Sequence, residues 1–302
     1  MILHERKLVS IILPTFNGSR FLEQSIISCI RQTYKNWELI IVDDASMDQT
    51  PEIIKKYINL DYRIKTLRNS SNRKLPYSLN KGFKASQGVF FTWTSDANCF
   101  KPDAIESLVN FLESNQEVAI VYSDYVLVDE ENNKLGYVTA NIPDRLTTGN
   151  VVSASFLYRR KVHDKIGGFD ENLFLIEDYE FWLLASLSFK LMPLHKSLYY
   201  YRMHNSSLTS KNKEVLHSMR EKLLSRYLPK MKWAKDSYRA EGYLLLAKLA
   251  KHRNDRRRIL YYLIHTLRCR PSLCNFIKVF LFAMDSFLSR KRYFSSSRIF
   301  NA

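Results

Sequence analysis

Polar and acidic residues follow three separate apolar runs in the first third of the chain. These are residues 9–13 before 14–18 (PTFNG), 38–42 before 43–46 (DDAS), and 89–93 before 94–98 (TSDAN). A carboxylate at the end of a buried strand can bind sugar hydroxyls and nucleobase N–H groups, or hold a hard divalent cation through oxygen. Open α/β sheets bind ligands at the carboxyl ends of their strands, so the sequence predicts a binding site there.

Helical patterns separate these runs. Residues 19–31 carry apolar side chains at a spacing of three to four, and helices are also predicted over residues 50–57 and 76–85. Strands alternating with helices indicate an α/β fold, a Rossmann-like and mostly parallel doubly wound sheet flanked by helices. No Gly-x-Gly-x-x-Gly or P-loop follows the first run, which argues against a dinucleotide-binding or P-loop protein.

The acids after the second run have an alternative explanation as helix caps. Asp48 and Thr50 precede or open the helix predicted from residue 50, and capping is sufficient to explain them. Capping does not call for two adjacent acids directly at a strand end. We therefore expect Asp44 to have a binding role.

Several ordered motifs resemble the family 2 glycosyltransferases of GT-A fold. The resemblance runs from about Lys7 to about Ser210. The motifs are residues 13–18 (LPTFNG), 32–34 (QTY), 37–46 (WELIIVDDAS), 48–50 (DQT), 79–82 (LNKG), 85–88 (ASQG), 166–171 (IGGFDE), 177–182 (EDYEFW) and 201–204 (YRMH).

The resemblance implies a donor site and a metal. Pro14, Thr15 and Phe16 would hold the nucleotide base and Asp44 would accept a hydrogen bond from it. The other residues implied on the donor side are Asn80, Ser95 and Asp96. Ser95-Asp96-Ala97 stands where the family has a metal-binding acid motif, but Ala97 cannot ligate. A Mg²⁺ or Mn²⁺ ion held by Asp96 and His204 would bind weakly, because an anionic ligand is missing.

The same resemblance implies a catalytic base. Asp178 matches the family's base, which would remove the proton of an acceptor hydroxyl and give inversion at the sugar carbon. For Glu177, an acid in a first helical turn, pairing with the helix dipole is an equally good explanation. Arg202, Lys211 and Lys213 are candidates for neutralising the donor diphosphate if the metal site is poor.

Positive charge is concentrated at the end of the chain. The net charge is +16, and residues 215–302 contain 20 Lys and Arg against 5 Asp and Glu, while residues 1–214 contain 26 against 25. Apolar side chains recur there at helical spacing. We therefore predict a catalytic domain over residues 1–213 and a basic helical tail over residues 214–302, with the boundary near residues 206–213.

Three roles are open for this tail. Its helices pack on the catalytic domain, or they bind an anionic membrane surface, or, less in keeping with the absence of a recognition motif, they bind nucleic acid. Residues 273–288 are the most apolar stretch, but Lys278 and Asp285 interrupt it and it is too short to span a bilayer. No signal peptide is legible, and the cysteines lack zinc or disulfide spacing, which favours reduced thiols and a cytoplasmic location at the inner membrane face.

Together these features predict an inverting glycosyltransferase. It would move a sugar from a nucleotide-diphosphate donor, UDP-linked as the resemblance implies, to a saccharide or lipid-linked acceptor, as in cell-surface polysaccharide synthesis. The alternative is a nucleotide-sugar-binding or scaffold protein whose catalysis has weakened with Ala97.

Overall fold

The computed structural model describes residues 6–204, 213–272, 276–277, 279–282 and 284. The chain divides into two compact units, Met1–Pro143 with Asn150–Lys213, and Asp144–Gly149 with Glu214–Ala302. We call them the catalytic unit and the helical unit. The short segment 144–149 thus groups with the end of the chain, which the sequence did not indicate.

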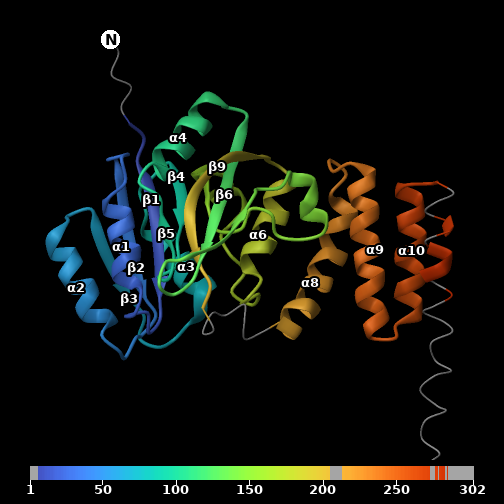
Figure 1. The fold of residues 1–302 in the computed structure, drawn as a ribbon, viewed down its shortest axis with the longest axis horizontal. Coiled ribbons are helices and arrows are strands. Elements are labelled where there is room, and N and C mark those ends of the chain that lie inside the picture. The colour runs from blue at the N-terminus through green and yellow to red at the C-terminus, as the bar shows by residue number, and fades with distance from the viewer. Residues whose placement is uncertain (1–5, 205–212, 273–275, 278, 283, 285–302) are drawn as a thin grey trace, which may run out of the picture. The chain divides into compact units, whose positions relative to one another are not determined.

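The catalytic unit is built on one mixed sheet of nine strands in the described residues (Figure 1). Its order is β3-β2-β1-β4-β8-β6-β9-β5, with β7 paired to β6. The strands are β1 Val9–Thr15, β2 Trp37–Asp43, β3 Ile64–Arg68, β4 Phe90–Trp93, β5 Cys99–Phe100, β6 Val118–Val128, β7 Lys134–Val138, β8 Phe156–Arg159 and β9 Lys190–Arg202. Strands β1 to β4 pair in parallel, as does β6 with β9, and the remaining pairs are antiparallel. The predicted α/β class is confirmed.

Helices cover both faces of this sheet. They are α1 Leu22–Ile30, α2 Thr50–Leu60, α3 Lys74–Ala85, α4 Ala104–Ser114, α5 Arg160–Ile166 and α6 Glu177–Ser186. Buried side chains of α1, α2 and α4 share a core with alternate residues of β1 and β2. On the other face α3 approaches β1 so closely that a Cβ at Gly82 would lie 2.5 Å from a methyl of Ile12. Every residue of β1 and β2 is therefore buried.

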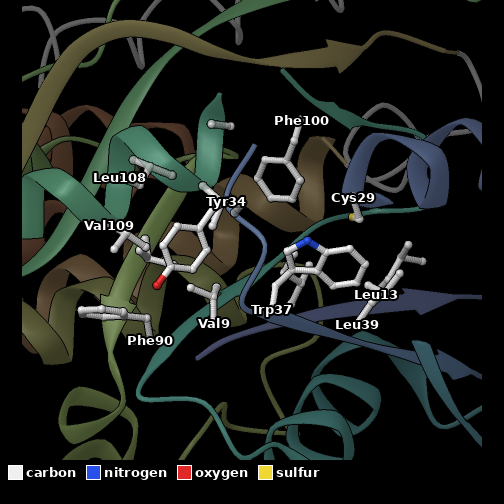
Figure 2. Packing of buried hydrophobic residues seen from close by; sticks show 14 of the residues in the cluster. Val9, Leu13, Cys29, Tyr34, Trp37, Leu39, Phe90, Phe100, Leu108 and Val109 are labelled. Atoms are coloured by element: carbon white, nitrogen blue, oxygen red, sulfur yellow. The ribbon is translucent and has the colours of Figure 1, made fainter. Parts of the chain in front are cut away.

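Large aromatic side chains fill the core on the α1 and α4 side (Figure 2). Trp37 and Phe100 lie beside Cys29 of α1, and Tyr34 lies near Val109 of α4. The Tyr34 hydroxyl donates to the carbonyl oxygen of Lys7 at 2.5 Å. This packing fixes the start of β1 and β2, and so sets where their carboxyl ends lie.

The helical unit contains α8 Lys213–Tyr227, α9 Asp236–His252 and α10 Arg256–Cys269, together with the 3-10 helices η1 Pro143–Thr147, which begins one residue before the unit, and η2 Leu228–Lys230. These helices confirm the helical nature predicted for the tail. None of the described helices combines the length and apolar character needed to cross a bilayer. The predicted boundary at residues 206–213 falls almost wholly outside the described residues. Of the apolar stretch 273–288, the structure describes residues 276–277, 279–282 and 284. The described cysteines, Cys29, Cys99 and Cys269, are free thiols.

Candidate functional site

The carboxyl ends of the first parallel strands meet at one edge of the sheet. Thr15 at the end of β1 lies opposite Asp43 at the end of β2. The Thr15 hydroxyl donates to Oδ2 of Asp96, in the loop after β4, at 2.7 Å. Parallel pairing thus brings together the three polar groups that the sequence separates by up to 80 residues.

The loops after β1 and β2 are bound to each other. Asn17, with a left-handed φ of 51°, donates its backbone N–H to the Ser46 hydroxyl at 2.9 Å and accepts the Met47 N–H on its side chain at 2.9 Å. Phe16, the residue before Asn17, has 44% of its surface exposed. Pro14 is buried in the sheet opposite Val42, so of this predicted group Phe16 is the residue that offers a surface to a ligand.

Asp44 is buried at the start of the second loop and accepts three hydrogen bonds. Its oxygens receive the side-chain N–H of Asn69 at 2.7 Å and the backbone N–H groups of Arg73 and Lys74 at 2.8 and 2.9 Å. Since Arg73 and Lys74 begin α3, Asp44 does satisfy amides at a helix end. Asp44 therefore binds amides at the start of α3 and does not cap the helix from residue 50, whose first N–H is accepted by Asp48. An ionised carboxylate has about four acceptor sites, which leaves one for a ligand.

The capping role of Asp48 is confirmed. Asp48 accepts the backbone N–H of Thr50, the first residue of α2, at 3.0 Å and that of Ser19 at 3.1 Å. Burial raises its pKa, but the hydrogen bonds from Thr50 and Ser19 outweigh burial and lower the pKa to about 2.

The Ser95-Asp96-Ala97 loop offers a metal ion a single carboxylate, that of Asp96. Burial raises the pKa of Asp96, and its Oδ2 already accepts from Thr15. Ala97 contributes only a methyl group, and the side-chain oxygen of Asn98 accepts the backbone N–H of Arg202 at 2.9 Å. Within the described ranges no three His, Cys, Asp or Glu side chains are grouped to hold a metal ion. The residues present therefore do not fit the divalent cation expected of Asp96 and His204.

Arg202, at the end of β9, is a buried structural residue. All five of its N–H groups are used, and the acceptors are the carbonyl oxygens of Ala97, Asp129 and Glu130 and the side-chain oxygens of Gln24 and Asn132, at 2.7 to 3.0 Å. No N–H remains for a diphosphate. The proposed neutralising role of Arg202 is therefore wrong, and Lys211 and the side chain of Lys213 lie outside the described residues.

His204 lies just beyond β9. Its ring is edge-on to Phe21, with the ring centroids 5.9 Å apart, and the Arg202 guanidinium lies 4.6 Å from the same Phe21 ring. These contacts place His204 next to the start of α1.

Asn80 positions a loop. Its side-chain N–H groups donate to the carbonyl oxygen of Phe169 at 2.8 Å and to the Glu171 carboxylate at 3.1 Å, and its oxygen accepts the Phe169 N–H at 2.8 Å. Gly168 has a φ of 95°, and a Cβ there would lie 2.7 Å from the Asn80 oxygen, so this approach requires glycine. Because both amide hydrogens are used, the geometry assigns Asn80 to holding residues 168–171 and does not support the predicted donor contact.

Asp178 is held in the first turn of α6. Its Oδ2 accepts the side-chain N–H of Asn150 at 2.8 Å and its Oδ1 accepts the backbone N–H of Tyr179 at 2.6 Å. Burial raises the pKa of Asp178 to about 6, although both hydrogen bonds act to lower it. Such a carboxylate is largely ionised at neutral pH and is a stronger base than an ordinary aspartate.

Glu177, the residue before Asp178, is a buried acid without a compensating charge. Its Oε2 has no hydrogen-bond partner in the described part of the chain. Burial, and secondly the charge of Asp178, raise the pKa of Glu177 to about 8. Glu177 therefore holds a proton to higher pH than an ordinary glutamate, although backbone N–H groups at the start of α6 act in the opposite direction.

An aromatic series connects α6 to the end of β4. Trp182, one turn after Asp178, packs edge-to-face on Phe156 of β8 with centroids 4.8 Å apart, and Phe156 contacts Trp93 at 5.9 Å. Trp93 is the last residue of β4, two residues before Ser95. The Ser95 carbonyl oxygen in turn accepts the Ser25 hydroxyl at 3.0 Å. These contacts place the helix of Asp178 on the strand that leads to Asp96.

Sequence reasoning missed two residues of this site, Asn150 and Asn69, and gave a third, Arg202, a different role. Asn150 orients Asp178, Asn69 binds Asp44, and Arg202 fixes the Ala97 loop. Arg202 stood within a recognised motif, but the role assigned to it was wrong. Neither asparagine lies in a motif, and nothing in the sequence distinguishes them from the other asparagines.

Comparison with known sequences gives one family. Residues 10–167 match the family described as Glycosyl transferase family 2. An uncharacterized glycosyltransferase of Rickettsia typhi is 32% identical over 244 residues, which are 74% of this chain and 72% of the relative. Another from Rickettsia conorii is 30% identical over 230 residues, which are 68% of this chain but 36% of the relative. The chain thus spans about a third of the length of some curated relatives.

Solved structures show the same fold at low sequence identity. TarS of Staphylococcus aureus, crystallised with UDP-GlcNAc, matches with a TM-score of 0.65 and 18% identity over 93% of this chain and 82% of that chain. A mannosyltransferase of Pyrobaculum calidifontis, in complex with GDP-Man and Mn²⁺, matches with a TM-score of 0.60 and 15% identity over 96% of this chain and 83% of that chain.

Proposed function

Because the chain belongs to the family 2 glycosyltransferases, we propose that it transfers a sugar from a nucleoside-diphosphate sugar to a hydroxyl of a saccharide or lipid-linked acceptor. The donor is proposed to be UDP-linked, and the product to be part of a cell-surface polysaccharide. TarS, which shares the fold, was crystallised with UDP and with UDP-GlcNAc, and this supports the choice of donor.

The donor nucleotide is proposed to bind at the carboxyl edge of β1, β2 and β4. Phe16 offers an exposed ring for the base, and Asp44 has an acceptor site for a base N–H group. Thr15, Ser95 and Asp96 lie beside them at the ends of β1 and β4 and are proposed to contact the rest of the donor. Both loops are tied down by hydrogen bonds before any ligand binds, which lowers the entropy lost on binding.

The single observation that carries the reaction is Asp178, a half-buried carboxylate of raised pKa oriented by Asn150. Asp178 takes the proton of the acceptor hydroxyl while that oxygen attacks the anomeric carbon. The bond from this carbon to the diphosphate oxygen breaks, and the nucleoside diphosphate leaves from the opposite side. One base and one displacement give inversion, and general-base catalysis contributes roughly 10²- to 10⁴-fold.

The alanine at position 97 is the observation that favours an alternative function, nucleotide-sugar binding without catalysis. A chain without a metal-binding acid in this loop would bind a nucleotide sugar without turning it over, as a scaffold protein. The oriented base argues for catalysis, since a binding protein has no use for a carboxylate of raised pKa beside Asn150.

The test is turnover of a panel of nucleotide sugars by the wild type, Asp178→Asn and Asp164→Asn. Asparagine cannot accept a proton, so Asp178→Asn is expected to lower kcat at least about a hundredfold with little change in donor Kd. Asp164 is exposed on α5 and serves as the matched control. Near wild-type turnover in Asp178→Asn would remove this residue from the mechanism, and a wild type that binds a donor but turns over none would favour the scaffold.

The acceptor class suggests where the protein works. Lipid-linked saccharides are presented at a membrane, and we propose that the chain acts as a peripheral protein at the cytoplasmic face.

A further inference from the structure

The α10 helix has two apolar faces. Its inner face, Ile259, Tyr262, Leu263 and Thr266, is buried within the helical unit. The residues of its opposite face recur at helical spacing. We call this the outer face of α10, and its members are Arg257, Leu260, Tyr261, Ile264 and Arg268.

The outer face is exposed although its centre is apolar. Leu260, Tyr261 and Ile264 are 53%, 51% and 42% exposed. A soluble helix normally has charged residues opposite its buried face, and a helix that is apolar on both faces buries the second face against something else. Scattered single exposed apolar residues need no such explanation, but a contiguous set on one helix does.

Exposed apolar side chains also occur in the described residues after α10. Nineteen large apolar side chains are exposed in the described chain, and eight of them fall between residues 260 and 284. The five that follow α10 are Phe276, Ile277, Phe280, Leu281 and Met284, each 43% to 63% exposed. The remaining exposed apolar residues are spread over the rest of the protein.

Positive charge accompanies these apolar residues without any acid. Residues 256–284 contain six Lys and Arg and no Asp or Glu. Arg257 and Arg268 flank the apolar centre of the outer face, and neither has a carboxylate partner among the described residues. Arg258, in contrast, pairs with Asp255 and Glu221 at 3.4 Å. Two arginines left unpaired around an exposed aliphatic and aromatic centre match an interface that is anionic at its surface and apolar below it.

We propose that the outer face of α10 binds the surface of an anionic lipid bilayer. Leu260, Tyr261 and Ile264 enter the boundary between headgroups and acyl chains, while Arg257 and Arg268 remain at the level of the lipid phosphates. Nucleic acid would satisfy the arginines but would leave Leu260 and Ile264 exposed. This inference rests on the location proposed above and is independent of the transfer reaction.

The experiment is co-sedimentation of the full chain, without any donor or acceptor, with vesicles of phosphatidylcholine alone or mixed with phosphatidylglycerol. We expect at least about tenfold tighter binding to the mixed vesicles at low salt, falling as salt is added. Leu260→Ser/Tyr261→Ser/Ile264→Ser should weaken binding about tenfold or more, since it removes the inserted groups. Arg257→Gln/Arg268→Gln should weaken binding at low salt and have little effect at high salt.

Matched controls use equally exposed residues of the catalytic unit, Leu60→Ser/Tyr62→Ser/Leu135→Ser and Lys55→Gln/Lys84→Gln, which should bind vesicles as the wild type does. Circular dichroism checks that each variant is folded. The proposal is overturned if the wild type ignores the mixed vesicles, if the outer-face variants bind as well as the controls, or if the chain binds duplex RNA instead of vesicles. If the wild type does not bind vesicles but forms a dimer, and the triple serine variant dissociates this dimer, the outer face of α10 would instead bind a second copy of the chain. Because no turnover is measured, an inactive enzyme that still binds vesicles would contradict the proposed function alone.

Discussion

At the scale of single residues, the sequence predicted which polar groups meet at the site but not the hydrogen bonds that these groups already make within the protein. Thr15 and Asp96 meet as parallel strand ends must, and this was predictable. The hydrogen-bond partners of Asp44, Asp178 and Arg202 were not, because they come from segments 25 to 178 residues away. A sequence motif identifies a residue type at a strand or helix end, and it does not reveal how many of that residue's hydrogen bonds the fold has used.

Glu177 should make the stability of the protein depend on pH. The raised pKa of about 8 means that folded Glu177 keeps a proton that the unfolded chain loses above the ordinary glutamate pKa of 4.5. Stability contributed by the neutral acid is therefore full below pH 4.5 and is lost as the pH rises towards 8. The glutamine of Glu177→Gln cannot titrate, so the variant should gain stability relative to wild type over this range, on the order of 4 kcal/mol at pH 8.

Urea unfolding at pH 5 and pH 8 measures this difference. Glu52→Gln, on the exposed side of α2, is the control and should change both values little. A Glu177→Gln variant whose stability relative to wild type is the same at the two pH values would show that Glu177 is ionised in the folded protein.

Ala97 should make donor binding independent of divalent metal. The loop supplies one carboxylate that is bonded to Thr15 and no second acid, so removing metal with EDTA should leave donor Kd unchanged. Ala97→Asp adds an anionic oxygen and should give Mn²⁺-dependent donor binding about tenfold tighter, equal to about 1.4 kcal/mol. Titration calorimetry with and without EDTA measures both. Loss of wild-type donor binding in EDTA would show that a cation binds despite this residue set.

At the scale of elements, the sequence analysis predicted β1, β2 and β4, and it did not predict the edge strand β3 or the buried strands β6 and β8. The recognised strands β1, β2 and β4 are continuous apolar runs because helices cover both of their faces. The edge strand β3 was missed, since only Ile64 of its five residues is buried and its sequence IKTLR has no apolar run. Helices α1 to α3 were predicted to within a few residues at each end, and those differences are of the size expected from frayed termini.

Arg202 links four elements, and replacing it should loosen all of them. Its guanidinium joins the end of β9 to α1, to the Ala97 loop and to residues 129–132. Arg202→Lys keeps the charge but has too few donors for five acceptors, so buried carbonyl oxygens lose their partners and the unfolding free energy should fall by about 3 kcal/mol.

Thermal unfolding of Arg202→Lys tests this, with Arg160→Lys on α5, a partly exposed arginine paired with Asp164, as the control. The control should lie within about 0.5 kcal/mol of wild type. Equal midpoints for Arg202→Lys and Arg160→Lys would mean that the five hydrogen bonds add no net stability.

At the scale of the whole molecule, the two units do not divide at one point of the chain. We predicted domains of 1–213 and 214–302, but residues 144–149 contact the helical unit. Leu146 and Thr147 are fully buried, the Thr147 carbonyl oxygen lies against Gly242 of α9, and Lys235 donates its backbone N–H to Asp144 at 2.8 Å. The shift in charge after residue 214 located the helical region, but charge carries no information about a short inserted segment.

A chain ending at Lys213 should therefore expose residues 144–149, which it retains from the helical unit. Residues 144–149 would lose the side chains that bury them, and Asn150, which orients Asp178, follows directly. We expect limited proteolysis to cut at 144–149 in the shortened chain and not in the full chain, with cleavage sites read by mass spectrometry. The triple serine variant of α10 is the control, since it leaves this segment covered. Equal resistance of the shortened and full chains would show that the segment needs no cover.

The placement of residues 144–149 also bears on inheritance. A unit joined at one point can be gained, lost or exchanged between genes by a single crossover at its end. Here the segment and helices α8 to α10 complement each other, so a crossover near residue 213 would join helices from one parent to a buried segment from another. Chimaeras in this family should function when residues 144–149 and helices α8 to α10 come from the same parent. The helical unit is therefore expected to be inherited together with its catalytic unit.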